Sequence, residues 1–215
     1  MSRRAACALL LVAGIAPGAA WDADRMQQAA HRTGAGAVAA LPALHALLTT
    51  DQQGGEAALV AAVNRFFNTR IVFRTDLEVW GVEDHWASPL EVLDKGAGDC
   101  EDYAIGKFFT LLAAGVPGER LRLVYVRALL RAADGSQRPQ AHMVLAYHPQ
   151  PGSEPSILDN LRADIVPASR RPDLTPVFSF NHEGLWQGST PAGDPLARLS
   201  RWRQVLAKAR AEGFL

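Results

Sequence analysis

Apolar residues recur at every third or fourth position through much of the first half of the chain, and this spacing predicts helices. Residues 41–67 show the pattern most clearly, and Gly54-Gly55 divides them into two helices. Residues 21–40 are compatible with helix, but their periodicity is weak. The first half of the chain is therefore expected to be mainly helical.

A further helix is predicted to begin at Cys100, where Asp99 provides an N-cap. Its apolar positions recur at core-facing spacing until about Ala114, and Gly115 ends it. Residues 198–211 show a basic amphipathic pattern that predicts a last helix. Both segments are expected to pack one face on a core.

Beyond residue 120 the pattern changes to alternation, which is typical of strands. Asp134-Gly135 is a turn signal between two of them. Because helices come first and antiparallel strands follow, the predicted fold class is α+β. The predicted strands span residues 71–73, 121–126, 141–148, 156–161 and 172–180.

Residues 76–91 are aromatic and acidic and are predicted to form a loop that ends near Pro89. Trp80 and Trp86 lie in this loop. Trp80 and Trp86 can both be ordinary core aromatics, or one of them can line a substrate cleft or donate its indole N–H. The pattern alone leaves both interpretations open.

The first twenty residues have the pattern of a secretory signal peptide. Two arginines precede an apolar run, and small residues follow it up to Ala20. The run is too short for a membrane span, although an uncleaved anchor or a buried helix is the alternative. The expected organisation is a signal peptide at 1–20, an N-terminal extension at 21–40 and one domain at 41–215. The mature protein is expected in an exported compartment.

Composition narrows the choice of partner. Hydrophobic residues make up 48% of the 215 residues and charged residues 20%, as in ordinary globular proteins. The formal net charge is zero, so no polyanionic partner is indicated and nucleic-acid binding is not expected.

Cys100 is the one cysteine expected in the mature protein, because Cys7 lies in the predicted signal peptide. A lone thiol in an oxidising compartment is either buried and inert or used chemically. Cys100 follows two glycines at the start of a helix, where unpaired N–H groups favour a thiolate. The sequence around it therefore favours a nucleophile.

His142 and Asp159 follow in the order that a cysteine nucleophile needs. His142 lies early in one predicted strand and Asp159 lies in the next, so neighbouring antiparallel strands can bring the two side chains together. The histidine would act as base, and the aspartate would fix its tautomer. Each residue alone is weak evidence, since strand histidines and Asp-Asn turns are common; their joint occurrence with Cys100 is the signal.

Carboxylates flank the predicted nucleophile, and like charges oppose its ionisation. Asp99, Glu101 and Asp102 can simply cap the helix and fill its first turn. Alternatively, some of them bind a hard cation such as Ca²⁺, which takes six to eight oxygen ligands. Asp84 and Glu83 could complete such a site, but no EF-hand spacing is present.

Residues 40–210 resemble the bacterial transglutaminase-like cysteine proteinases. The Gly-Asp-Cys-Glu-Asp block combined with two downstream motifs makes the resemblance specific. The matching residues are Trp80, Asp84, Trp86, Pro89, Glu91, Gly98-Asp99-Cys100-Glu101-Asp102, His142-Met143-Val144-Leu145 and Leu158-Asp159-Asn160.

The resemblance implies a papain-like, transglutaminase-type core, with the nucleophile helix packed on an antiparallel sheet. It maps Cys100, His142 and Asp159 onto a catalytic triad. It also implies calcium dependence, with Asp99 and Glu101, and less directly Asp84, as metal ligands.

Periplasmic members of this family cut the N-terminal region of large surface adhesins beside a pair of alanines, which releases the adhesin and disperses biofilm. An inner-membrane cyclic-di-GMP receptor of the LapD type holds such proteases back. By resemblance, an adhesin substrate and such a receptor are the expected partners. Two alternatives stay open at this point: a transglutaminase with the same triad, and a non-enzymatic calcium-binding module.

Overall fold

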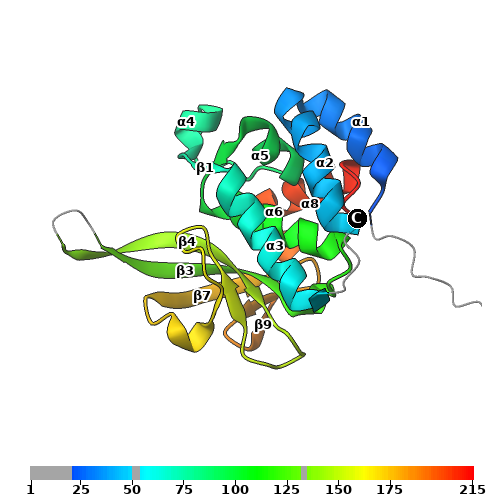
Figure 1. Ribbon diagram of the computed structural model, residues 1–215. Helices are drawn as coiled ribbons and strands as arrows, with labels where there is room; N and C mark the ends of the chain where they lie inside the picture. The colour runs from blue at the N-terminus through cyan, green and yellow to red at the C-terminus, as the bar shows by residue number, and fades with distance from the viewer. Residues whose placement is uncertain (1–20, 50–53, 132–134) are drawn as a thin grey trace, which may run out of the picture.

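Helices form one layer of the molecule and an antiparallel sheet forms the other, as Figure 1 shows. This computed structural model describes residues 21–49, 54–131 and 135–215. The predicted signal peptide and Asp134 of the predicted turn lie outside these ranges. No helix within them is long and apolar enough to cross a membrane. The predicted α+β class is confirmed.

The helices occupy the predicted regions, with additions. Helix α2 (Ala35–Thr49) runs across residue 40 without a break. The structure therefore shows no boundary at the predicted end of the N-terminal extension, and the division into an extension and a domain stays a prediction. Within the described residues, short 3-10 helices span Gly118–Arg120 and Ala168–Arg170. The α-helices are α1 (Ala23–Thr33), α2 (Ala35–Thr49), α3 (Gly55–Arg70), α4 (Asp76–Trp80), α5 (Pro89–Lys95), α6 (Cys100–Ala113), α7 (Pro195–Arg198) and α8 (Ser200–Ala211).

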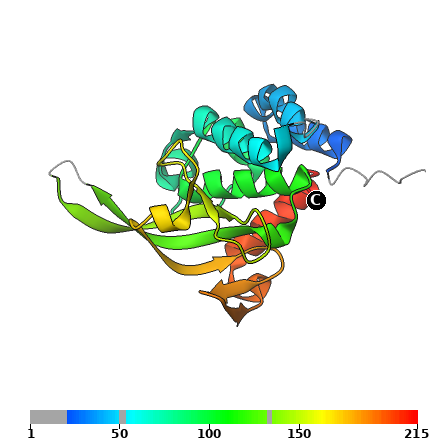
Figure 2. The same cartoon turned by 60° about the horizontal axis from the view of Figure 1, so that its bottom comes forward.

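Helix α6 lies between α3 and the sheet (Figure 2). It packs on α3 and α5 on one side and on the sheet on the other. Beyond its first turn nearly every side chain is buried, as expected for a helix covered on all sides. A Cβ at Gly106 would lie 2.4 Å from the ring of Phe67 in α3, so the glycine permits this close packing.

The main sheet has seven strands in the order β6-β5-β4-β3-β7-β8-β9, and all its neighbours are antiparallel. A separate parallel pair joins β1 (Val72–Phe73) and β2 (Ala97–Gly98). The long β3–β4 hairpin projects beyond the helices (Figure 1). The strands are β3 (Leu121–Arg131), β4 (Gln137–Tyr147), β5 (Ser156–Leu158), β6 (Val166–Pro167), β7 (Leu174–Phe180), β8 (Leu185–Gln187) and β9 (Thr190–Gly193).

Both faces of the central strands are buried, but in different cores. Met143 and Leu145 of β4 enter the main core with the helices. Val144 and Ala146 enter a smaller cluster with Val126, because successive side chains alternate between the faces of a strand. The chain beyond β4 folds back to cover this second face.

The segment predicted as a loop, residues 76–91, contains α4 and the first three residues of α5, and for these parts the prediction was wrong. Both helices begin with a capping box, in which a hydroxyl residue and a glutamate three positions later bond to each other's backbone. The N–H groups of Thr75 and Ser88 donate to Glu78 and Glu91, each at 2.9 Å. These two local signals identify the helix starts in the sequence.

The C-terminal helix joins the core through Trp202, which is fully buried. Its ring stacks on Phe109 of α6 with centroids 5.4 Å apart and meets Phe180 of β7 edge-on at 5.3 Å. Helix α8 thus connects the central helix to the sheet.

The C-terminal end of α8 contacts the start of α5. Glu212 is buried and accepts hydrogen bonds from the Ser88 hydroxyl and, at 3.2 Å, from the Leu90 N–H. Lys208 forms an ion pair with Glu91 at 2.8 Å. Burial raises the pKa of Glu212 to about 7. A carboxyl group with a raised pKa in the folded state stabilises the fold at low pH, and this contribution is lost as the pH rises through about 7.

We expect Glu212→Gln to gain stability relative to the parent as the pH rises from 5 to 8. The gain should be on the order of 3 kcal/mol, because the neutral amide removes the cost of ionising a buried acid. Urea unfolding of both proteins across this range measures the difference, with the exposed Glu83→Gln as control. If the free energies of unfolding of Glu212→Gln and the parent change equally with pH, the raised pKa of Glu212 is contradicted.

Candidate active site

A cavity of about 360 Å³ opens where the start of α6 meets β4. Cys100 and His142 both line it, with Asp99 and Glu101 beside them. The structure therefore brings the predicted nucleophile and base to one cavity. Asp159 lies behind His142, buried with 1% exposure.

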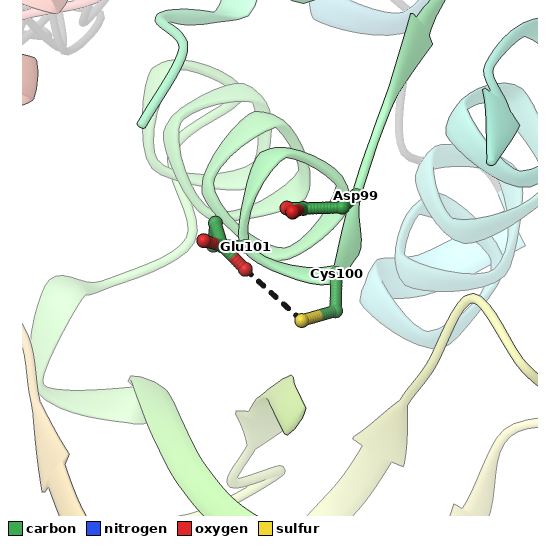
Figure 3. Close-up of side chains that lie close together, drawn as sticks. All are labelled: Asp99, Cys100 and Glu101. Carbon is green, nitrogen blue, oxygen red and sulfur yellow. Dashed lines mark hydrogen bonds between the residues drawn. The ribbon is translucent and has the colours of Figure 1, made fainter. Parts of the chain in front are cut away.

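Cys100 is the first residue of α6 and is partly buried. Its thiol donates to Glu101 Oε2 at 3.0 Å, the contact drawn in Figure 3. The backbone N–H of Met143, next to His142 in β4, donates to the sulfur. These two contacts fix the sulfur between the helix start and the strand.

The surroundings of Cys100 oppose its ionisation. Burial raises the pKa of the thiol, and the negative charges of Glu101 and Asp99 raise it further. The helix N-terminus favours the thiolate, as the sequence predicted, but it is outweighed. A thiolate at this position therefore requires compensation by positive charge.

His142 and Asp159 form a buried pair. The imidazole Nε2 lies 2.8 Å from Asp159 Oδ1, and the two side chains are 5% and 1% exposed. An ionised carboxylate only accepts hydrogen bonds, so Nε2 is the donor in this contact and Nδ1 is not engaged by Asp159. The predicted partnership of these residues is present, and it leaves Nδ1 for proton exchange with a nucleophile.

Strand register explains how the pair forms. Leu145 of β4 pairs with Leu158 of β5, and both side chains enter the main core. His142 pairs with Val126 of β3, a member of the smaller cluster, so its side chain lies on that second face of the sheet. Strand β5 ends at Leu158, so Asp159 can turn toward β4 just past the paired region.

A residue that sequence analysis missed completes this arrangement. Arg171 Nη2 donates to Asp159 Oδ2 at 2.8 Å, and Arg171 is 4% exposed. Burial alone would raise the pKa of Asp159. The hydrogen bond and charge of His142, followed by the Leu161 N–H and Arg171, hold that pKa well below its usual range. Asp159 is therefore an anion in the folded protein.

Acidic side chains converge on the other side of Cys100. Ligand atoms of Asp99, Cys100 and Glu101 lie within 4.8 Å of one another, and so do those of Asp76, Asp99 and Asp102. Asp76 at the start of α4 was not predicted as part of the site. It reaches Asp99 because the parallel pairing of β1 with β2 sets α4 beside the start of α6.

This cluster fits a hard cation. Asp76 Oδ1 and Asp99 Oδ1 are buried and have no hydrogen-bond partner among the described residues, a costly condition for carboxylate oxygens. Burial and the neighbouring Glu101 raise the pKa of Asp99 to about 8, and burial and Asp99 raise that of Asp76 to about 6. Oxygen donors of this kind are the ligands that Ca²⁺ prefers.

Two members of the acidic motif have other tasks. Asp102 accepts the Ala87 N–H at 2.8 Å and is fully buried, so it ties the chain before α5 to the start of α6. Asp84 accepts from the Trp86 indole at 3.1 Å and pairs with Arg201 at 2.9 Å. Asp84 lines the cavity but belongs to neither acidic group, so its role as a ligand stays a prediction.

The two tryptophans differ in position. Trp86 lines the cavity, stacks on Phe180 with centroids 5.8 Å apart and donates its indole N–H to Asp84. Trp80 lies elsewhere and packs against His85 at 4.3 Å. Of the two interpretations left open by the sequence, the cleft position applies to Trp86.

Comparison with known proteins agrees with this geometry. The family of bacterial transglutaminase-like cysteine proteinases matches residues 44–174, more than half of the chain. The chain belongs to this family. No curated protein sequence matches it.

Solved structures of LapG from Legionella pneumophila are similar to this chain over most of its length. One is 37% identical with a TM-score of 0.72, and the match covers 87% of this chain and 97% of that chain. A calcium-bound form is 38% identical (TM-score 0.71; 87% and 98% covered). An EGTA-treated form is also 38% identical (TM-score 0.73; 87% and 97% covered). The predicted family and the cysteine-proteinase class are thereby confirmed.

The Glu101 carboxylate should slow the chemistry of the Cys100 thiol when no divalent cation is available. In chelator at pH 8 we expect Glu101→Gln to react faster with iodoacetamide, by about tenfold for each unit by which the thiol pKa falls. Alkylation followed by mass spectrometry measures the rate. Glu83→Gln, an exposed acid outside the sulfur's contacts, is the matched control, and equal rates in all three proteins would exclude this role for Glu101.

Proposed function

We propose that the chain is a calcium-dependent cysteine endopeptidase in which Cys100 is the nucleophile, His142 the base and Asp159 the orienting acid. The observation that carries the proposal is that Cys100 and His142 line the same cavity. Asp159, which does not line it, contacts His142 Nε2 through Oδ1 at 2.8 Å. Membership of a cysteine-proteinase family supports the same assignment.

The first half of the reaction forms a thioester. The Cys100 thiol gives its proton to His142 Nδ1, and the sulfur attacks the carbonyl carbon of the scissile peptide bond. The Cys100 backbone N–H at the first helical position has no partner within the helix and can stabilise the oxyanion. His142 then returns the proton to the leaving amine as the C–N bond breaks.

The second half regenerates the enzyme. Water attacks the thioester carbonyl while His142 Nδ1 accepts its proton, and the acid product leaves as the sulfur recovers a proton. Asp159 stabilises the imidazolium in both halves through its bond to Nε2. An amine in place of water would give acyl transfer, the chemistry of a transglutaminase.

Asp99, Glu101 and Asp76 would hold calcium. When bound, the cation supplies positive charge that offsets the carboxylates opposing the Cys100 thiolate. The unpartnered oxygens of Asp76 and Asp99 support this role, and a calcium-bound structure of LapG from Legionella pneumophila exists among the similar proteins.

We further propose the substrate and setting that the family resemblance implies. The substrate is the N-terminal region of a large surface adhesin, cut beside a pair of alanines, and its release promotes biofilm dispersal. The protease acts in the periplasm after removal of residues 1–20. A LapD-like inner-membrane receptor for cyclic-di-GMP restrains it.

The mature protein should cleave an adhesin N-terminal fragment with a di-alanine site in calcium, and cleavage should stop in chelator. Cys100→Ala should abolish turnover and keep the fold, because only one partly buried sulfur is lost. Gel electrophoresis and mass spectrometry of the products measure this.

The matched control is a fragment in which two arginines replace the alanines. Incorporation of a labelled amine without peptide release would favour the transglutaminase. Folded protein with no cleavage, no amine incorporation and an unreactive Cys100 would exclude an enzyme and leave the calcium-binding module.

Calcium binding should depend on residues from both acidic groups. We expect Asp76→Asn and Asp99→Asn to weaken the calcium affinity about tenfold or more, because each removes one charged ligand. Isothermal titration calorimetry measures the affinity. Asp164→Asn is the control, since Asp164 is exposed and paired with Arg162 outside the cavity. Parent-like binding by Asp76→Asn would remove this residue from the metal site.

A further inference from the structure

Asp159 presents a physical problem that His142 alone does not solve. The carboxylate is 1% exposed, and a buried carboxylate is costly without a cationic partner. His142 is a cation only during part of the proposed reaction and is neutral whenever it acts as base. A second cation is therefore needed to keep Asp159 ionised throughout.

Two buried cations face Asp159. Lys107 of α6 lies within reach of its charge, but burial lowers the pKa of Lys107 to about 7, so this lysine is only partly charged near neutral pH. Arg171 approaches from the segment that covers the second face of the sheet, and a guanidinium stays charged at any relevant pH. Its Nη2 reaches Asp159 Oδ2 at 2.8 Å.

The hydrogen bonds on Asp159 fix its orientation from several sides. Oδ1 accepts from His142 Nε2 at 2.8 Å and from the Leu161 N–H at 3.0 Å, which leaves Oδ2 for Arg171. The backbone carbonyl of Asp159 accepts from Asn68 Nδ2 at 2.8 Å. Arg171 is thus the one side chain among the described residues that donates to Oδ2, and without it the carboxylate could turn away from the imidazole.

Arg171 itself is held rigidly. Its Nε and Nη2 donate to Asp173 at 3.0 and 2.8 Å. Arg171 lines a cavity of about 170 Å³ whose other walls are apolar residues, among them Val126 of β3, Val144 of β4 and Leu174 of β7. The small second core therefore sets the position of the guanidinium, and through it the position of Asp159.

We propose that Arg171 is a positioning residue of the active site, which holds Asp159 in the orientation that keeps His142 Nδ1 available to Cys100. The inference rests on the proposed function, since it concerns the same site. Arg171 touches neither the sulfur nor the cavity that would receive the substrate.

The test uses the full mature protein with calcium and the di-alanine fragment. We expect Arg171→Met to lower kcat about 100-fold, the cost of a misplaced catalytic group, with KM changed little because the arginine does not line the substrate cavity. Arg171→Lys keeps the charge and should recover part of kcat. The control is Arg170→Met, an exposed neighbour that should keep parent activity.

A double-mutant comparison separates positioning from general destabilisation. If Arg171 acts through Asp159, adding Arg171→Met to Asp159→Asn should cost little beyond Asp159→Asn alone. Three results would overturn the proposal. The double variant could lose kcat by the product of the two single losses, Arg171→Met could raise KM with kcat unchanged, or a folded Arg171→Met could keep full activity. Should Arg171→Met fail to fold, as judged by thermal melting, the same comparison is made with Arg171→Lys.

A substrate-independent readout keeps this proposal distinct from the proposed function. The iodoacetamide reaction of Cys100 in calcium reports the thiol and its imidazole partner without any peptide. It should slow in His142→Ala and, to a lesser degree, in Arg171→Met. No cleavage by the parent together with this pattern of alkylation would contradict the peptidase and retain Arg171. If the parent cleaves the fragment and Arg171→Met has the parent's alkylation rate and kcat, the peptidase is supported and the role of Arg171 is contradicted.

Discussion

Like charges crowded around one sulfur are the constraint on which this structure depends. Cys100 donates to Glu101, and the unpartnered oxygens of Asp76 and Asp99 lie nearby in a buried site. Repulsion and burial raise the pKa values of the thiol and of these acids. A fold that keeps such a cluster must either leave it protonated or supply positive charge. The ionisation of the Cys100 thiol is therefore coupled to any cation that binds these carboxylates.

The rest of the fold holds the two sides of this cluster in place. Asp102 binds the Ala87 N–H, and Glu212 of the C-terminal region binds the start of α5, so the chain before α6 is fixed at both ends. On the opposite side, the bond from the Met143 N–H sets the sulfur beside β4. Helix α6 needs this support because its first turn carries the conflicting charges while its remaining turns are buried.

Sequence patterns predicted the parts of the site that depend on local order. Cys100 was found from its helix start, and His142 and Asp159 from their places in successive strands. Asp76 and Arg171 were missed because their roles come from tertiary contacts: one through the pairing of β1 with β2, the other through a loop that folds over the sheet. The capping boxes at Thr75 and Ser88 were visible locally, and the short strands β8 and β9 carried too few residues for a clear alternation.

The negative charge of Asp159 and the negative charges beside Cys100 are compensated in different ways, and this difference has a functional consequence. Asp159 has a permanent partner in Arg171, built into the second core and independent of solution conditions. The carboxylates beside Cys100 have no such partner and lie at the cavity, where an exchangeable cation can reach them. If calcium binds as proposed, its removal would raise the pKa of the Cys100 thiol and leave the His142–Asp159 pair intact. An enzyme arranged this way can be switched through its nucleophile while its base stays organised.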